Sequence, residues 1–311
     1  MKIFVGVTDD RWFRFLRQLR PVEVNFWRPR AKTGFRALQP GEPFLFKLHS
    51  PNNYIVGGGF FVRHTVLPLS LAWDAFGEAN GAPDSDIFST RISKYSESSA
   101  RNREIGCTLL AEPFFFDEAD WIPVPSDWKA NIVSGKGYHT GEVEGQRLWN
   151  AVKERLQRYT WEEAVKDVSS EPYALNPERY GSEFLTRARL GQGTFRVLVT
   201  DAYQRRCAVS GERTLPVLEA AHIKPYTESR SHRPENGLLL RSDLHILYDR
   251  GYMTVTPDLR IEVSRRIREE FENGRHYYAF HGKSLDCLPE PPELQPGSKY
   301  LCWHNENGYK G

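Results

Sequence analysis

Short apolar runs, one of which alternates with polar residues over 40–49, predict strands along most of the first 140 residues. A helical period is predicted over about residues 9–20. Asn52-Asn53 predicts a hairpin turn, and the glycines at 57–59 predict a bulge or a close approach of backbone to another segment. Strands are predicted over 1–7, 40–49, 54–62 and 105–114.

The pattern changes after residue 140. Leu148, Val152, Leu156 and Tyr159 stand at helical spacing between charged residues and predict an amphipathic helix. The polar stretch that follows contains two prolines and reads as a linker. The chain therefore divides into three predicted parts, with the linker proper over 162–183: residues 1–140, residues 141–183 and residues 184–311.

Two short apolar runs and a helical pattern follow one another in the third part. The first run, 217–223, is bounded by prolines and predicts a strand, and 237–240 predicts a second one. The helical period then starts at Ser242, an N-cap candidate, and ends at Gly251. The unit is predicted as strand, loop, strand, helix. Two further helices are predicted, over 194–205 and near 264–273.

Composition is that of a soluble globular protein, with 40% hydrophobic and 26% charged residues among 311. No apolar run approaches the roughly 20 residues of a membrane span, and no signal-peptide core is seen, so we expect a cytoplasmic protein without a membrane partner. Four scattered cysteines form no CxxC pair, which argues against a disulfide framework and a cysteine-rich zinc site. The net charge of +2 does not by itself indicate a nucleic-acid binder.

Candidate chemistry lies in the strand, loop, strand, helix unit. His245 and Asp249 stand four residues apart on the predicted helix, so both side chains emerge from one face and can close on one ion. Imidazole with carboxylate suits zinc, manganese or nickel, and is less typical of magnesium held by oxygens alone. His222 on the neighbouring strand, free of the metal, could act as general base on a water.

With His222, Asn236 and His245 in this order on these elements, the segment resembles the ββα-metal motif of HNH nucleases. The resemblance implies that His222 is the general base, that Asn236 braces the loop or touches the metal, and that His245 and Asp249 hold one divalent ion (Mg²⁺, Mn²⁺, Ni²⁺ or Zn²⁺). Many members carry a metal ligand where this chain has Ala221. Glu219 either supplies the missing carboxylate or is a surface residue.

Basic residues near this unit are candidates for contact with phosphates. The opening LGQGxFR, followed by Cys207-Ala-Val-Ser-Gly211, resembles one bacterial branch of HNH endonucleases. Gln192 either touches the DNA backbone or caps its own helix. The DNA-binding candidates are Arg187, Arg189, Gln192, Arg196, Lys224 and Arg241.

The first part resembles the PUA-like barrels that include EVE and SRA-type readers of modified bases, on the run 25–29, the strand opening at Pro40-Gly41-Glu42 and the run 55–58. Such readers flip a base into a pocket between aromatic rings. Each aromatic candidate could equally be an ordinary core residue. The pocket candidates are Asn25, Trp27, Tyr54, Trp73, Asp84, Trp121 and Trp128.

These observations predict an α+β protein, with an N-terminal PUA-like β-barrel domain that selects the substrate and a C-terminal ββα-metal HNH domain that cuts it. We expect a metal-dependent endonuclease that restricts foreign phage DNA bearing modified cytosine in a duplex. Cleavage of both strands by a one-site enzyme needs a homodimer or two successive nicks. An RNA-directed nuclease or toxin and an inactive modified-DNA-binding protein remain the alternatives.

Overall fold

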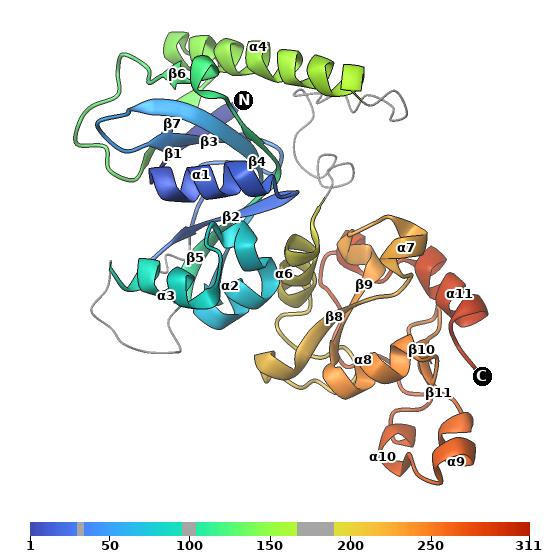
Figure 1. The fold of residues 1–311 in the computed structure, drawn as a ribbon. Helices are drawn as coiled ribbons and strands as arrows, with labels where there is room; N and C mark the ends of the chain where they lie inside the picture. Colours follow the sequence, from blue (N-terminus) through green and yellow to red (C-terminus); the bar gives the residue numbers. More distant parts are fainter. Residues whose placement is uncertain (30–33, 95–103, 167–189) are drawn as a thin grey trace. The chain divides into compact units, whose positions relative to one another are not determined.

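A computed structural model describes residues 1–29, 34–94, 104–166 and 190–311, with the side chains of residues 159–166 left aside. The chain forms two compact units, Met1–Arg189 and Leu190–Gly311, and each is described by itself (Figure 1). Strands and helices occur in both units, so the predicted α+β class is confirmed. Among the described residues, no helix combines the length and the apolar character needed to cross a membrane.

One mixed sheet organises the N-terminal unit. Its strands follow the order β2-β5-β4-β3-β1-β7, and β6 pairs with β4. The contact of β1 with β3 is parallel, and the other pairs are antiparallel. The strands are β1 (Lys2–Thr8), β2 (Glu23–Arg28), β3 (Pro43–Leu48), β4 (Tyr54–Pro68), β5 (Glu104–Phe115), β6 (Ile122–Pro123) and β7 (Gly135–His139).

Alternating side chains of these strands enter two different cores. Ile3 and Val5 of β1 pack on one face with the helix α4 (Val143–Lys166), whereas Phe44 and Phe46 of β3 pack on the other with α1 (Asp10–Leu19). Because successive strand residues point to opposite faces, a helix on each face buries both sets. Apolar side chains therefore stand on both faces of these strands, as in β3, where all six residues are buried.

The predicted hairpin is present, and the structure shows why a glycine is needed at position 57. β3 and β4 are antiparallel with a register shift in the pair, and the turn lies between Leu48 and Tyr54. A Cβ atom on Gly57 would come within 2.3 Å of the backbone oxygen of Phe114 on β5. The predicted close approach is thus confirmed. Extended backbone continues to Pro68, beyond the predicted end at residue 62.

Three helical elements between β4 and β5 were not predicted. They are α2 (Leu69–Phe76), η1 (Gly77–Asn80) and α3 (Ser85–Ser93). Asn80, which is fully buried, holds this region because its Nδ2 donates to the backbone oxygens of Ala72 and Gly77. Such side-chain bonds to backbone leave no periodic signal in the sequence.

The predicted amphipathic helix is α4, with Leu148, Val152 and Leu156 in the core. It also runs through residues 162–166, which the sequence interpretation assigned to the linker, so that boundary was wrong. The rest of the predicted linker, 167–183, lies outside the described residues.

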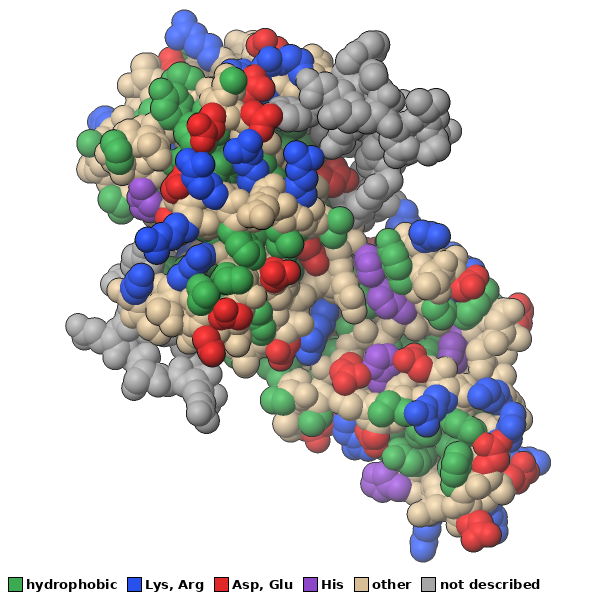
Figure 2. Space-filling model, in the orientation of Figure 1, with side chains coloured by type: hydrophobic (Ala, Val, Ile, Leu, Met, Phe, Trp, Pro, Cys, Tyr) green, Lys and Arg blue, Asp and Glu red, His purple; other side chains and the backbone are tan. Residues whose placement is uncertain are grey.

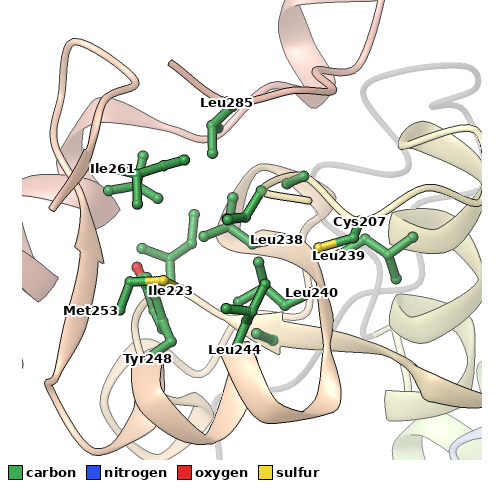
Figure 3. Packing of buried hydrophobic residues seen from close by; sticks show 14 of the residues in the cluster. Cys207, Ile223, Leu238, Leu239, Leu240, Leu244, Tyr248, Met253, Ile261 and Leu285 are labelled. Atoms are coloured by element: carbon green, nitrogen blue, oxygen red, sulfur yellow. The ribbon is translucent and has the colours of Figure 1, made fainter. Parts of the chain in front are cut away.

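The C-terminal unit is built on two small antiparallel pairs of strands, β8-β9 and β10-β11. Figure 3 shows Leu238 and Leu240 of β9, and Ile223 directly after β8, converging with Leu244 and Tyr248 of α8 in one core. The elements are α6 (Gln192–Ala202), η3 (Leu215–Val217), β8 (Leu218–His222), α7 (Tyr226–Ser229), η4 (Pro234–Asn236), β9 (Gly237–Arg241), α8 (Ser242–Asp249), β10 (Met253–Val255), β11 (Ile261–Val263), α9 (Arg266–Phe271), α10 (Arg275–Tyr278), η5 (Pro292–Leu294) and α11 (Ser298–Asn307).

The predicted strand, loop, strand, helix unit is present as β8, η4, β9 and α8, with one local error. Ser242 is the first residue of α8 rather than its N-cap, because its hydroxyl donates to the backbone oxygen of Val217. Gly251 ends the helix as predicted, with a φ of +75° that side chains rarely adopt. The helix predicted near 264–273 is α9, which is shorter.

Candidate active site

His222 lies at the end of β8, directly opposite Gly237 of β9. Its ring stacks on Phe195 of α6, with ring centroids 3.9 Å apart and planes 11° apart. A Cβ atom on Gly237 would lie 2.5 Å from a methyl carbon of Val199 and 3.0 Å from the Phe195 ring. Glycine at 237 thus lets α6 approach the sheet closely enough to hold the imidazole.

The environment of His222 keeps its imidazole neutral. Burial, followed by the charges of His232 and His245, lowers the pKa of His222 to about 4. Near pH 7 the ring therefore carries one proton and one free lone pair. A half-buried imidazole in this state can accept a proton from water.

Asn236 is fully buried and fastens the loop between β8 and β9. Its Oδ1 accepts the backbone N–H of Lys224 at 2.9 Å, and its Nδ2 donates to the backbone oxygen of Lys224 at 2.9 Å. The same Nδ2 contacts Ser229 Oγ at 3.3 Å and the backbone oxygen of Ser231 at 3.4 Å. In this structure the Asn236 amide is wholly engaged in bracing the loop.

His245 lies on α8 between two carboxylates. Its Nδ1 is 2.6 Å from Glu219 Oε2 on β8, and its Nε2 is 3.2 Å from Asp249 Oδ2, four residues on in the same helix. Glu219, for which the sequence left two roles open, is therefore next to His245. Figure 2 shows histidine side chains gathered on the visible face of this unit, with acidic side chains on both sides of one of them.

The two carboxylates respond differently to this arrangement. The hydrogen bond from His245 lowers the pKa of Glu219. Burial raises the pKa of Asp249, and the charge of Glu219 adds to that rise. A neutral imidazole has a single N–H. If that proton lies on Nδ1 and faces Glu219, the Nε2 lone pair points at the Asp249 carboxylate.

Two lone-pair donors that face each other fit a cation between them, and a carboxylate on the other ring nitrogen is the usual partner of a metal-bound histidine. His245 Nε2 and the Asp249 carboxylate thus fit a divalent ion chemically, with Glu219 on the other ring nitrogen. Within residues 1–29, 34–94, 104–166 and 190–311, no group of three or more His, Cys, Asp or Glu is already arranged to hold a metal ion.

The basic candidates around the site differ in their surroundings. Both nitrogens of one edge of the Arg241 guanidinium contact Asp243, at 2.6 and 2.8 Å. Lys224 Nζ lies 5.0 Å from the centre of the Trp303 ring. Arg196 is half-buried and its charge acts on Glu219.

The remaining phosphate candidates lie at or before the start of α6. Gln192 is exposed and is the first residue of the helix. The N-cap is Gly191, so Gln192 is not itself the N-cap of α6. Arg187 and Arg189 lie outside the described residues.

Three of the seven candidates for a base pocket meet in the N-terminal unit. Trp27 Nε1 donates to the backbone oxygen of Asn80 at 2.8 Å, and Asn25 Nδ2 donates to Asn80 Oδ1 at 2.9 Å. Trp27 and Trp73 both contact the Phe88 ring, with centroids 5.7 and 5.8 Å away. Asn25 is fully buried, and its Oδ1 has no hydrogen-bond partner.

The other four candidates have different partners. Tyr54 contacts Trp121, with ring centroids 5.9 Å apart, and Trp121 Nε1 donates to the backbone oxygen of Phe116. Trp128 has Lys47 Nζ over its ring at 5.1 Å. Asp84 is exposed and caps α3 by accepting the backbone N–H of Ile87 at 2.7 Å.

One residue beside the site was not found from the sequence. His232 Nδ1 lies 3.1 Å from His222 Nε2. Its ring stacks on Tyr226, with centroids 4.1 Å and planes 11° apart. His232 stands in an irregular loop without hydrophobic periodicity, so no spacing rule pointed to it.

Comparisons with known proteins agree with the C-terminal site. The family model of HNH endonucleases matches residues 207–256, which contain β8, η4, β9 and α8. No curated protein matches the chain. The C-terminal unit therefore contains a segment of the HNH endonuclease type, which marks the chain as a nuclease enzyme.

Among solved structures, the ASCH protein of Zymomonas mobilis is 12% identical and covers 48% of this chain and 94% of its own, with a TM-score of 0.33. A variant of that protein covers 48% and 98% at 12% identity and the same TM-score. A structure described as the modification-dependent TagI restriction endonuclease is 13% identical, covers 85% of this chain and 60% of its own, and has a TM-score of 0.26. These scores are too low to decide a shared fold.

Proposed function

We propose that this protein is a metal-dependent DNA endonuclease in which His222 activates water and His245 with Asp249 holds one divalent ion. The observation that carries the proposal is the gathering of His222, Asn236 and His245 on one strand, loop, strand, helix unit, within the segment matched by the nuclease family model. Neither histidine is explained by packing alone, since each presents a ring nitrogen to another ionisable side chain.

His222 has the properties that a general base needs. Its lowered pKa leaves a lone pair free near neutral pH, and the stack on Phe195 fixes the plane of the ring. It takes the proton of a water placed in line with the scissile phosphodiester. Asn236 contributes through the loop, since it ties both backbone groups of Lys224, two residues after His222.

His245 and Asp249 bind the ion in this proposal, and Glu219 orients the His245 ring through its contact with Nδ1. The 2.6 Å contact between Glu219 and His245 Nδ1 holds the proton on that nitrogen and leaves Nε2 for coordination. A bound divalent ion supplies positive charge that stabilises the pentavalent phosphate and the leaving 3′ oxygen. Glu219 thus serves the site as a carboxylate that orients a ligand, with direct coordination as the alternative role.

The N-terminal unit selects the substrate in this proposal, as a PUA-like reader of duplex DNA with modified cytosine. The support is the sequence resemblance, together with the grouping of Trp27, Trp73 and Asn25 around Asn80. A flipped base stacks on aromatic rings and is read on its polar edge. The biological role is then restriction of modified phage DNA in the cytoplasm.

The test is cleavage of duplexes carrying cytosine, 5-methylcytosine, 5-hydroxymethylcytosine and glucosylated cytosine, each with magnesium, manganese, nickel and zinc. Matched RNA duplexes are run in parallel. We expect metal-dependent cleavage of modified DNA by the full chain and complete loss of cleavage in His222→Ala, with DNA and metal binding kept. Preferred cleavage of RNA would favour an RNA-directed nuclease. Binding without cleavage under every metal would favour an inactive reader.

The division of labour is tested with fragments. We propose the parts 1–140, 141–183 and 184–311 as reader, connector and nuclease. Fragment 1–160 should bind duplex DNA with a preference for modified cytosine, reduced in Trp27→Ala, and fragment 182–311 should nick without preference. Selective cleavage by 182–311 alone would contradict the assignment.

A further inference from the structure

His232 lies in direct contact with the ring of His222. The two rings come from different parts of the unit: His222 ends β8, and His232 lies in the loop between α7 and η4. The contact between His222 Nε2 and His232 Nδ1 measures 3.1 Å, which is a hydrogen bond between two imidazoles. Such a bond needs one nitrogen with a proton and one with a lone pair.

Only one of the two possible proton arrangements leaves His222 able to act as a base. If His232 donated from Nδ1, His222 Nε2 would accept, and the proton of neutral His222 would then occupy Nδ1. Neither nitrogen of His222 could take a proton from water. If His222 donates from Nε2, its Nδ1 lone pair is free.

We propose that His232 is a positioning residue that accepts the Nε2–H of His222, and thereby makes Nδ1 of His222 the atom that takes the proton from water. This inference rests on the proposed nuclease function. When His222 gains the proton, its Nε2–H becomes the donor of a charge-assisted bond to His232, which stabilises the imidazolium as it forms. The proton goes from the water to His222 Nδ1 as the water oxygen bonds to phosphorus. The bond from phosphorus to the 3′ oxygen breaks, and the leaving 3′ oxygen takes a proton from solvent water.

The surroundings of the pair keep His232 neutral and its ring fixed. Burial lowers the pKa of His232, so that the ring is neutral near pH 7 and one nitrogen keeps its lone pair. Stacking on Tyr226 of α7 fixes the ring plane, and Phe195 of α6 lies 5.7 Å from it. The groups around His222 are the Phe195 and Tyr226 rings, His232, and the charge of His245 on α8.

Asn236 extends this control to the loop backbone. Its Nδ2 reaches the backbone oxygen of Ser231, the residue before His232. One buried amide therefore ties together the segment that follows His222 and the segment that carries His232. The positions of the two imidazoles are set by the same brace.

Two substitutions separate the acceptor from the packing. His232→Asn places an amide oxygen near the position of Nδ1 and so keeps a hydrogen-bond acceptor there. His232→Phe keeps an aromatic ring stacked on Tyr226 but has no acceptor. We expect kcat to fall roughly 10- to 100-fold in His232→Phe, as for a lost bond to a charged group, with KM unchanged. His232→Asn should restore most of kcat. His276→Ala, an exposed histidine on α10, is the control and should match the unchanged chain.

The tautomer of His222 gives a readout that does not depend on cleavage. Nitrogen-15 correlation spectra of the full chain, assigned with His222→Gln, should show the Nε2–H form of His222 in the unchanged chain and in His232→Asn. A mixture of forms is expected in His232→Phe. An Nδ1–H form in the unchanged chain would overturn the inference, as would unchanged kcat in a folded His232→Phe variant. If His222→Gln still cleaves, the proposed function fails instead.

Discussion

Asn236→Ala tests whether the middle residue of the site acts on the loop or on the metal. The substitution removes an amide that bonds both backbone groups of Lys224 and reaches Ser229 and Ser231. Two backbone groups then lose their partners in a half-buried loop. Each such group costs about 1–3 kcal/mol when unpaired, so we expect the C-terminal unit to lose roughly 2–4 kcal/mol of unfolding free energy, with water offsetting part of the cost.

The assay combines urea unfolding with amide hydrogen exchange. Exchange should rise most in residues 224–233, the segment that the amide fastens, and cleavage should fall because His232 and His222 lose their common brace. The matched control is Asn307→Ala on α11, where an exposed amide donates to the backbone oxygen of Trp303. That variant should stay within about 0.5 kcal/mol of the unchanged chain.

Metal titration decides between the two roles of Asn236. Bracing predicts that the affinity for manganese in Asn236→Ala remains close to that of the unchanged chain, since His245, Asp249 and Glu219 lie on α8 and β8. A large loss of manganese affinity with normal exchange in 224–233 would refute the bracing argument and place Asn236 at the ion.

Three other predictions concern ionisable groups. Because the pKa of His222 is lowered to about 4, the acidic limb of cleavage under saturating metal should lie near that value, and a limb at the ordinary histidine pKa of about 6.5 would argue against His222 as the base. Burial lowers the pKa of His304 to about 4, so as the pH falls the unfolded chain takes up this proton before the folded chain does. Acidification from about pH 6.5 to 4 should therefore remove up to about 3 kcal/mol of unfolding free energy, measured by urea unfolding. The loss should be smaller in His304→Phe. Glu219→Ala should weaken manganese binding about 10- to 100-fold by calorimetry, and equal affinity would exclude an orienting role.

Local pattern was sufficient for the nuclease unit. An apolar run between prolines predicted β8, a second short apolar run predicted β9, and the switch to helical period predicted α8 with Gly251 at its end. The spacing of His245 and Asp249 placed both side chains on one helical face, where the structure finds Nε2 and Oδ2 3.2 Å apart. These features follow from periodicity within a few residues, which the sequence displays directly.

Contacts between distant segments were decided only by the tertiary structure. The alternation of β1 and β3 could not say that α1 and α4 cover opposite faces of the sheet, or that η1 gathers Trp27 and Asn25 around Asn80. Ser242 was misassigned because its hydroxyl bonds Val217, 25 residues earlier. Each outcome depends on partners that the chain brings together only after the core has formed.

For His222, too, the sequence determined one part of the site and the tertiary structure the rest. The sequence alone identified His222 as a candidate base, since the order of residues shows a histidine at the end of an apolar strand, followed by a loop that contains an asparagine. Packing of α6 through Gly237 placed Phe195 on its ring, and loop closure placed His232 on its Nε2. Those partners set the orientation and pKa of the imidazole, because burial and hydrogen bonding are properties of the folded surroundings and not of the residue order.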